Sequence, residues 1–264
     1  MDLGIAGKVA FVGGGSKGMG RATAEQLGRE GCRVAVVALA DDKGAIDDTV
    51  RSITDAGGTA VGIAGDLTTR DDVEQAVAAA TDALGAPDIA VVNVDGPGKG
   101  NFAEVSDEAF ALAMDRMTMS VVYVARAVLP SMQAQAWGRL VVLNSVGASE
   151  PQPERILVNP SRAAVVALNK SLSDEFARDG ITVNTIATGW IGTDRMFRGL
   201  AAEAARRGVA PEDVLTELTN QFPARRIGLP EEMASVIAFL CSQGAGYITG
   251  ELIHVDGGYH RGAF

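Results

Sequence analysis

Short apolar runs rich in Val and Ile alternate with longer amphipathic stretches from one end of the chain to the other. The expected strands cover residues 8–13, 33–39, 59–65, 88–94, 139–145, 181–187 and 251–257. The expected helices lie near residues 19–30, 43–56, 71–84, 106–136, 160–179 and 230–242. Strands with nearly continuous apolar character are typical of parallel sheets covered on both faces. The alternation therefore predicts right-handed βαβ units and an α/β fold with a doubly wound, seven-stranded parallel sheet.

No linker or change of composition divides the 264 residues, so we expect a single domain. Residues 193–229, between the sixth and seventh strands, are polar and Ala-rich and interrupt the alternation. Ligands of open α/β sheets bind outside the carboxyl ends of the strands. This lid-like insertion is therefore a candidate substrate lid, and a surface helical insertion is the equally weighted alternative.

Composition excludes several classes of function. The net charge is -10, and the acidic residues are spread along the chain, which argues against a nucleic-acid partner. Cys32 and Cys241 stand alone, without companions that would suggest a disulfide framework or a metal site. No apolar stretch is long enough to cross a bilayer, and the first residues do not resemble a signal peptide, so we expect no membrane partner and a cytoplasmic protein.

A glycine-rich segment, "VGGGSKGMGRATAEQL", follows the first expected strand and opens the first expected helix. Gly14, Gly18 and Gly20 have the spacing of a dinucleotide-binding loop. Because glycine has no side chain, these positions allow a tight turn, a close approach of the backbone to a pyrophosphate, and tight packing of the helix. Phosphates placed there would meet free N–H groups and the positive end of the helix dipole. The segment therefore predicts a dinucleotide site on a Rossmann fold.

Four further motifs make the whole chain resemble the short-chain dehydrogenases/reductases, and within them the 3-oxoacyl-carrier-protein reductase-like members. The motifs are "GDLT" after the third strand, "NVDGPG" after the fourth, "ITVNTIATGWIGTD" around the sixth, and the C-terminal "ARRIGLPEEMASVIAFLCSQGAGYITGELIHVDGGY". Thr188 replaces the proline usual in the third of these motifs. The resemblance implies an oxidoreductase that binds a nicotinamide dinucleotide and a small-molecule substrate.

The resemblance also implies which residues hold the cofactor. They are Gly14, Ser16, Lys17, Gly18, Met19, Gly20, Asp66, Leu67, Asn93, Gly96, Arg162, Gly189, Ile191 and Thr193. Lys17 in the glycine-rich loop is a feature of NADP-using relatives and favours NADP. Asp41 and Asp42 would repel a 2′-phosphate, which keeps NAD as the alternative.

The family's catalytic pattern is only partly present. In the family a tyrosine donates the proton, a lysine four residues later lowers its pKa, a serine thirteen residues earlier binds the carbonyl oxygen, and a helix asparagine anchors a proton-relay water. Ser145 matches the serine. Val158 occupies the tyrosine position, Arg162 the lysine position and Met117 the asparagine position. The run "VNPSRAA" resembles an atypical subgroup that lacks the Tyr-x-x-x-Lys pair.

Two interpretations of this departure stay open. In the first, Ser145 and Arg162 are the catalytic residues of a reductase with a non-standard proton path, because Arg162 keeps its charge at any working pH. Its substrates would then give a stabilised product anion, as quinones, β-dicarbonyls and enones do. In the second, the protein is catalytically silent or non-redox and keeps the fold for binding. None of the remaining candidate proton donors has the interval of the missing tyrosine: Tyr123, Tyr247, Tyr259, His254 and His260.

The resemblance suggests a homotetramer or homodimer in which the helices at 106–136 and 160–179 pack against a second copy. The apolar side chains of Val121, Val122, Val124 and Ala125 would contribute to such an interface, or else to an ordinary core.

Overall fold

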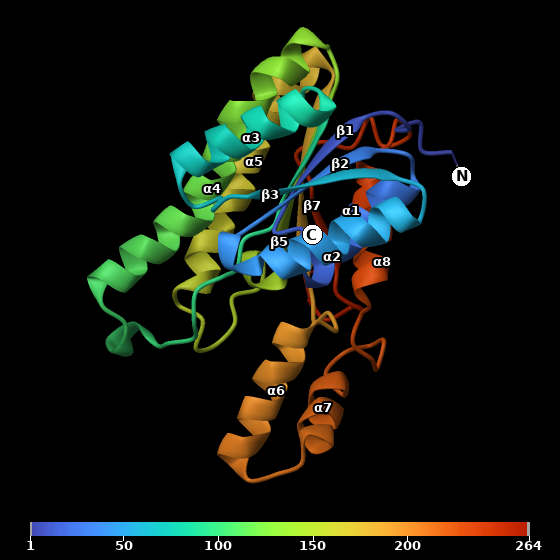
Figure 1. Cartoon of the computed structure of the whole chain (residues 1–264). Helices are drawn as coiled ribbons and strands as arrows, with labels where there is room; N and C mark the ends of the chain where they lie inside the picture. The colour runs from blue at the N-terminus through green and yellow to red at the C-terminus, as the bar shows by residue number, and fades with distance from the viewer. Residues whose placement is uncertain (1, 263–264) are drawn as a thin grey trace.

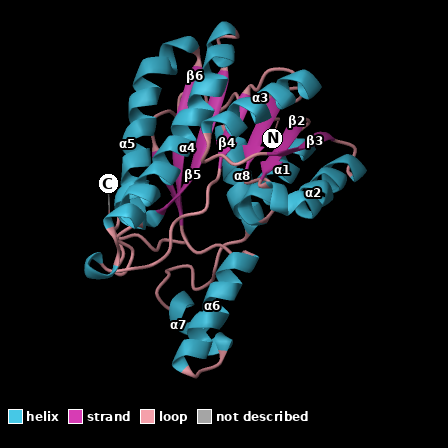
Figure 2. Ribbon diagram, turned by 60° about the vertical axis from the view of Figure 1, so that its left-hand side comes forward, coloured by secondary structure: helices cyan, strands magenta, loops and turns pink. Residues whose placement is uncertain are grey.

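The computed structural model describes residues 2–262, which form a parallel sheet between two layers of helices (Figures 1 and 2). The strands are β1 (Val9–Gly13), β2 (Arg33–Ala38), β3 (Thr59–Ala64), β4 (Ile89–Val92), β5 (Gly138–Ser145), β6 (Ile181–Thr188) and β7 (Leu252–Val255). They are ordered β3-β2-β1-β4-β5-β6-β7, and every neighbouring pair is parallel. The predicted doubly wound, seven-stranded sheet is confirmed.

Helices cover both faces of the sheet, as the nearly continuous apolar runs predicted. One face carries α3 (Arg70–Leu84), α4 (Asp107–Ala134) and α5 (Val158–Phe176), and the other carries α1 (Gly18–Arg29), α2 (Lys43–Asp55) and α8 (Pro230–Leu240). Each face has its own buried core, so that β1, β4 and β5 are buried along almost their whole length. The order of the strands reverses at β1 and β4, where the carboxyl ends of these strands open a crevice for ligands.

The predicted element limits are met to within a few residues, with one informative difference. The apolar run at 251–257 predicts a longer last strand, but β7 ends at Val255. Gly257 and Gly258 both have positive φ, which turns the chain away from the sheet. All four residues of β7 are partly exposed, because β7 is an edge strand of the sheet.

The insertion between β6 and the last helix forms two helices, α6 (Asp194–Arg207) and α7 (Pro211–Thr219), which project from the body of the protein (Figures 1 and 2). Thr193 caps α6 by accepting a hydrogen bond from the Met196 N–H at 3.3 Å. Leu200 and Ala204 are the buried residues of α6, and α7 has none. The insertion thus begins at the carboxyl edge of the sheet, and its role as a lid stays a prediction.

The apolar residues of α4 and the two cysteines lie mostly in the buried core. Val121, Val124 and Ala125 belong to the buried core beneath α4, so only Val122 of this group is partly exposed. Cys32 and Cys241 are both buried and free. Within residues 2–262, no helix is long and apolar enough to cross a membrane, and no group of three or more His, Cys, Asp or Glu side chains could hold a metal ion.

Candidate functional site

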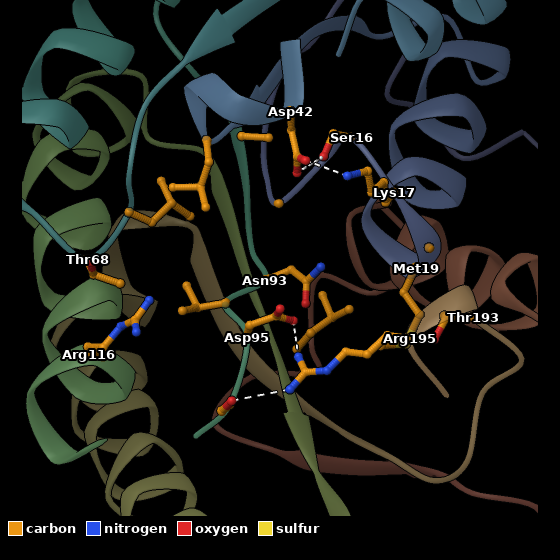
Figure 3. Close-up of a pocket in the computed structure, with 18 of the residues that line it drawn as sticks. Ser16, Lys17, Met19, Asp42, Thr68, Asn93, Asp95, Arg116, Thr193 and Arg195 are labelled. Atoms are coloured by element: carbon orange, nitrogen blue, oxygen red, sulfur yellow. Dashed lines mark hydrogen bonds and ion pairs between the residues drawn. The ribbon is translucent and has the colours of Figure 1, made fainter. Parts of the chain in front are cut away.

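A cavity of about 550 Å³ opens at the carboxyl ends of the strands and follows the edge of the sheet from β2 to β6. It brings together most of the residues expected from the sequence, from segments far apart in the chain. These are Gly14, Ser16, Lys17, Gly18, Met19, Asp66, Leu67, Asn93, Gly96, Ser145, Arg162 and Thr193. Figure 3 shows several of their side chains pointing into the same space.

Three expected residues, Gly20, Gly189 and Ile191, lie behind the wall of the cavity and not on its surface. A Cβ atom on Gly20 would lie 2.0 Å from the carbonyl oxygen of Gly14, so this glycine lets α1 pack against the glycine-rich loop. A Cβ atom on Gly189 would lie 2.6 Å from Cα of Asp256, and Ile191 is buried. The two glycines therefore let backbone segments approach one another, whereas Ile191 belongs to the buried core.

The glycine-rich loop is a cradle that only glycine can form. Gly14 has a φ of 64°, and a Cβ atom there would lie 2.4 Å from the carbonyl oxygen of Asn93. Gly18 has a φ of 53° and faces the methyl group of Thr193, which a Cβ atom would approach to 3.0 Å. The first N–H groups of α1 have no intrahelical partner and carry the positive end of the helix dipole. The loop therefore offers free donors to an anionic ligand.

The β2 end of the cavity holds a cluster of charged and hydroxyl side chains (Figure 3). Asp42 accepts a hydrogen bond from Ser16 Oγ at 3.1 Å and forms an ion pair with Lys17 Nζ. The hydrogen bond from Lys17 is the main reason that the pKa of Asp42 is lowered, so its carboxylate stays charged. Lys17 and Asp42 together leave little net charge at this end.

Asp66 and Leu67 line the cavity beside this cluster. Asp66 Oδ1 accepts hydrogen bonds from the N–H and the hydroxyl group of Thr68, at 2.9 Å and 2.8 Å. Its side chain is therefore fixed by its own turn, while the carboxylate remains on the cavity surface.

Ser145 lies at the last position of β5, where the strand delivers it to the cavity. Its hydroxyl oxygen accepts a hydrogen bond from the Gly147 N–H at 3.2 Å. Its backbone N–H donates to the side chain of Asn144, whose own amide group donates to the carbonyl oxygen of Arg162. The hydroxyl proton of Ser145 is thus left to bond a ligand, since its oxygen already serves as an acceptor for the chain.

Arg162 is on α5, and its guanidinium group ties the ends of two strands together. It donates from Nη1 to the carbonyl oxygen of Leu143 at 3.1 Å, and from Nη2 to that of Val94 at 3.4 Å. Its Nε is buried and has no partner among residues 2–262. Burial lowers the pKa of Arg162 to about 10, with a further lowering by Arg195 and an opposing effect of Asp95. Arg162 is therefore still a cation at neutral pH.

Buried apolar side chains occupy the two positions where the resemblance to the family implies a tyrosine and an asparagine. Val158, the first residue of α5, is 5 % exposed, and Met117 on α4 is 3 % exposed. Neither lines the cavity. No tyrosine, histidine or cysteine of residues 2–262 lines it either. Within this part of the chain the cavity therefore offers no phenol, imidazole or thiol as a proton donor.

The cavity also contains charged residues that the sequence motifs do not indicate. Arg195 on α6 forms an ion pair with Asp95 and donates to the carbonyl oxygen of Gly96 at 3.3 Å, which ties the insertion to the loop after β4 (Figure 3). Arg116 on α4 and Arg198 on α6 are exposed and line the same cavity. The spacing of Arg195 and Arg198, three residues apart just after Thr193, could have indicated one basic face of α6.

These features fit a dinucleotide. The cradle of glycines and the free N–H groups suit a pyrophosphate, and the charged cluster at the β2 end suits a ribose. The cavity extends from there to Ser145.

Comparison with known proteins agrees with this geometry. The family model for enoyl-(acyl carrier protein) reductase matches residues 14–260. The 3-oxoacyl-(acyl-carrier-protein) reductase FabG of Vibrio cholerae is 33 % identical over 258 residues, which are 98 % of this chain and 99 % of the relative. Dehydrogenase/reductase SDR family member 4 of Sus scrofa is 32 % identical over 95 % of this chain and 86 % of the relative.

Solved structures are similarly close. L-sorbose reductase of Gluconobacter frateurii, solved with NADPH and L-sorbose, superposes with a TM-score of 0.93 at 31 % identity and covers 98 % of both chains. Actinorhodin polyketide ketoreductase with NADPH superposes with a TM-score of 0.90 at 31 % identity, over 96 % of this chain and 97 % of the other. Fold, glycine-rich loop and near full-length matches lead to one conclusion: the chain belongs to the short-chain dehydrogenase/reductase family.

Proposed function

We propose that this protein is an NAD(P)-dependent oxidoreductase that reduces a conjugated ketone or a quinone by a non-standard proton path. The observation that carries the proposal is the presence of Ser145 in the same cavity as the glycine-rich loop, with no phenol, imidazole or thiol beside it. A hydride acceptor would have an oxygen ligand there but no side chain to protonate it.

The cofactor is a nicotinamide dinucleotide, NADP or NAD. Glycines 14 and 18, Ser16, Lys17 and Met19 would hold its phosphates and ribose, and Asn93, Gly96 and Thr193 line the path toward Ser145. The solved relatives named above contain NADPH. When bound, the reduced cofactor supplies a hydride to the substrate. The ion pair between Lys17 and Asp42 weakens the argument from Lys17 for NADP alone.

Ser145 and Arg162 would act on the substrate oxygen in different ways, one by a hydrogen bond and the other by its positive charge. The Ser145 hydroxyl donates a hydrogen bond to that oxygen, since its own oxygen accepts from Gly147. Arg162 offsets the negative charge that develops on the substrate oxygen as hydride is added, because a charged group in a partly buried site acts over several ångströms. The proton then comes from solvent water or from the substrate itself.

These two roles limit the substrates to compounds whose product anion is stable without a positioned proton donor. A simple ketone gives an alkoxide, whose strong basicity makes a positioned acid valuable, typically by about 10² to 10⁴ in rate. Hydride addition to the β-carbon of an enone gives an enolate, and hydride addition to a quinone gives a phenolate; both are far weaker bases than an alkoxide and can leave the site unprotonated. A β-dicarbonyl compound reduced at one carbonyl carbon gives an alkoxide and so belongs with the simple ketones. The absence of an acid among the cavity residues therefore favours enones and quinones.

The proposal is tested by measuring NADPH and NADH oxidation with cyclohexenone and benzoquinone. Turnover is expected with at least one of them, and Ser145→Ala should lower kcat by about 10²-fold while cofactor affinity stays within twofold. Ser171→Ala, an exposed serine on α5, is the matched control and should leave both unchanged. The proposal fails if no compound oxidises either cofactor above background, or if Ser145→Ala has full activity.

A second candidate function, a catalytically silent cofactor-binding protein, is favoured by a different observation. Val158 and Met117 fill two catalytic positions with buried apolar groups, and Arg162 donates to backbone carbonyl oxygens of two strand ends. All three substitutions serve the stability of the fold. Under this alternative, calorimetry would detect binding of NADP or NAD while the substrate panel gives no turnover.

Three further expectations remain part of the proposal. Residues 193–229 act as a lid over the substrate, the protein works as a homodimer or homotetramer in the cytoplasm, and it belongs to the subgroup without the Tyr-x-x-x-Lys pair. Arg195 supports the first of these, because it joins α6 to the loop after β4 across the cavity.

A further inference from the structure

Arg195, in the first turn of α6, joins the insertion at 193–229 to the body of the protein. It forms an ion pair with Asp95 in the loop after β4, and its Nη2 donates to the carbonyl oxygen of Gly96 at 3.3 Å. Within residues 2–262, no other side chain of α6 forms a hydrogen bond or an ion pair with a residue outside the insertion. All three residues line the cavity, so this single side-chain contact of α6 crosses it.

The contact lies beside the glycine-rich loop. A Cβ atom on Gly18 would lie 3.0 Å from the methyl carbon of Thr193, which caps α6 two residues before Arg195. A Cβ atom on Gly14 would lie 2.4 Å from the carbonyl oxygen of Asn93, where the loop after β4 begins. The glycine-rich loop thus touches both of the segments that Arg195 connects. Figure 3 shows the Arg195 side chain reaching from the side of Thr193 to the loop after β4.

Two helices place positive potential at the same point. α1 begins at Gly18 and α6 begins at Asp194, so the proximity of Gly18 and Thr193 brings the two N-termini together. The first N–H groups of each helix have no intrahelical partner, and the positive ends of the two dipoles favour an anion. In a dinucleotide site of this fold the pyrophosphate lies at the glycine-rich loop. A bound pyrophosphate therefore lies close to the first turn of α6, which carries Arg195.

The ion pair of Arg195 with Asp95 can be exchanged. The side chain of Asp95 is 81 % exposed and that of Arg195 is 54 % exposed, so water and salt screen the pair. A guanidinium group bonds two phosphate oxygens as well as it bonds two carboxylate oxygens. A pyrophosphate carries two negative charges against the single charge of Asp95. A cofactor anion in the cradle therefore competes with Asp95 for Arg195.

The other cations of the cavity are less suited to this exchange. Lys17 is paired at the β2 end, and Arg162 donates to the carbonyl oxygens of two strand ends. Arg116 and Arg198 also line the cavity, but no hydrogen bond or ion pair within residues 2–262 fixes the position of their guanidinium groups. Arg195 is the cation whose own bonds place it beside the glycine-rich loop.

We propose that Arg195 is a further cofactor-binding residue, which exchanges Asp95 for the pyrophosphate of the bound dinucleotide. This inference rests on the cofactor binding that is part of the proposed function. Asp95 is then a competitor of the cofactor for the guanidinium group. Binding of the dinucleotide opens the contact between α6 and the loop after β4, and attaches the insertion to the cofactor instead.

The test uses the opposite effects that loss of a ligand and loss of a competitor have on affinity. Dissociation constants of NADPH, NADH and ADP-ribose are measured by calorimetry for the full chain as wild type, Arg195→Ala, Asp95→Asn and the double variant. ADP-ribose contains the pyrophosphate but no nicotinamide. Arg198→Ala and Asp194→Asn are the matched controls, because both residues are exposed on α6, line the same cavity and form no ion pair within residues 2–262.

Arg195→Ala should raise the dissociation constant of all three ligands by about tenfold, because a charge-assisted bond to phosphate is lost. Asp95→Asn should lower it by about two- to fivefold, because the guanidinium group no longer has a competing carboxylate. The double variant should match Arg195→Ala, because Asp95 acts only through Arg195. Both controls should stay within about twofold of the wild type, because exposed charges that form no bond are screened.

A bridge that only holds the loop after β4 gives a different pattern, in which Arg195→Ala and Asp95→Asn both weaken binding. That pattern overturns the inference, as does an unchanged affinity in Arg195→Ala. Equal effects of a control and its matched variant also overturn it, as does an effect on NADPH that ADP-ribose does not show. If the wild type binds none of the three ligands, the proposed cofactor is wrong as well. If the expected pattern holds but no substrate turns over, the exchange at Arg195 stands and the reductase proposal alone fails.

Discussion

The two ends of the cavity are built from different parts of the chain. The cofactor end depends on the backbone, because Gly14 and Gly18 adopt positive φ, and a Cβ atom on Gly14 or Gly20 would collide with neighbouring carbonyl oxygens. The catalytic end depends on side chains that the strands and α5 deliver to the cavity, such as Ser145 and Arg162. A backbone cradle is lost together with the fold, whereas a side chain can be exchanged while the fold persists. This difference is consistent with a chain that keeps the glycine cradle while Val158 and Arg162 stand where the resemblance to the family implies a tyrosine and a lysine.

Restoring the missing pair is the change with the largest expected effect. In Val158→Tyr combined with Arg162→Lys, a phenol stands thirteen residues after Ser145 with an ammonium group one turn away, which lowers the phenol pKa. Turnover of simple ketones should rise by about 10² to 10⁴ over the wild type. The larger ring at a 5 % exposed position should also lower stability by about 1 to 3 kcal/mol. Cofactor oxidation and thermal unfolding measure the two effects.

The matched control replaces Val158 with phenylalanine in the same Arg162→Lys background. The ring is the same size, but it lacks the hydroxyl group, so the stability loss should be similar and the rate gain absent. Equal rates for the tyrosine and phenylalanine variants would show that position 158 does not face the reacting oxygen, and that the catalytic end differs from the family in geometry as well as in residues.

The fold was predictable because its determinants repeat along the chain. Seven apolar runs with nearly continuous apolar character are needed for a sheet buried on both faces, and the structure places a strand at each of them. The glycine-rich loop was predictable for a similar reason, since its glycines are required by the backbone itself. The end of β7 was missed because the expected strand was carried past Val255 to Gly257, whereas Gly257 and Gly258 have positive φ and turn the chain.

For the proposed catalytic end, the sequence predicted which residues to look at but not the contacts that they make. The sequence indicated Ser145 and Arg162, but it could not show that Arg162 donates to Leu143 and Val94, because these bonds depend on how the strand ends meet α5. The contact between the loop after β4 and the loop before α5 has no sequence signal at all. It rests on backbone bonds of Gly100 with Glu154 and Ile156, which periodicity and spacing do not report.

At the cofactor end, substitution of Asp42 tests whether side chains set the preference between NADPH and NADH. Its carboxylate competes with a 2′-phosphate for Lys17 and Ser16, because it already bonds both of them. Asp42→Asn should raise affinity for NADPH relative to NADH by about two- to tenfold, a modest effect because the pair is partly exposed and screened. Fluorescence titration with both cofactors measures the ratio.

Asp41→Asn removes the same charge from the neighbouring residue, which is exposed and makes no side-chain bond among residues 2–262. If both variants change the ratio equally, Asp42 acts through long-range charge and the contact with Lys17 is irrelevant. If neither variant changes the ratio of NADPH to NADH affinity, these two carboxylates do not set the cofactor preference. Cofactor binding at this end would then depend mainly on the backbone of the glycine-rich loop.

The smallest expected effect concerns the segment that follows Ser145. Ser149 Oγ lies 2.8 Å from His254 Nε2, and the ring of His254 stacks on His260 at 3.7 Å. Burial and the charge of His260 lower the pKa of His254, against the opposing effects of Asp256 and Glu150. Because the folded-state pKa lies below the unfolded one, the unfolded chain binds more protons between them, and stability falls as the pH drops below about 6.5.

His254→Gln should remove this part of the acid sensitivity. Between pH 7 and pH 5, Tm should fall slightly less in the variant than in the wild type, by on the order of one degree, because the ring is partly exposed. His260→Gln removes one cause of the lowered pKa and should give an intermediate slope. If all three proteins lose Tm equally, the contact with His254 does not hold the loop after β5. Backbone contacts would then fix that loop, as they fix the cofactor end. The two ends of the cavity would differ less in how they are held than the side-chain contacts indicate.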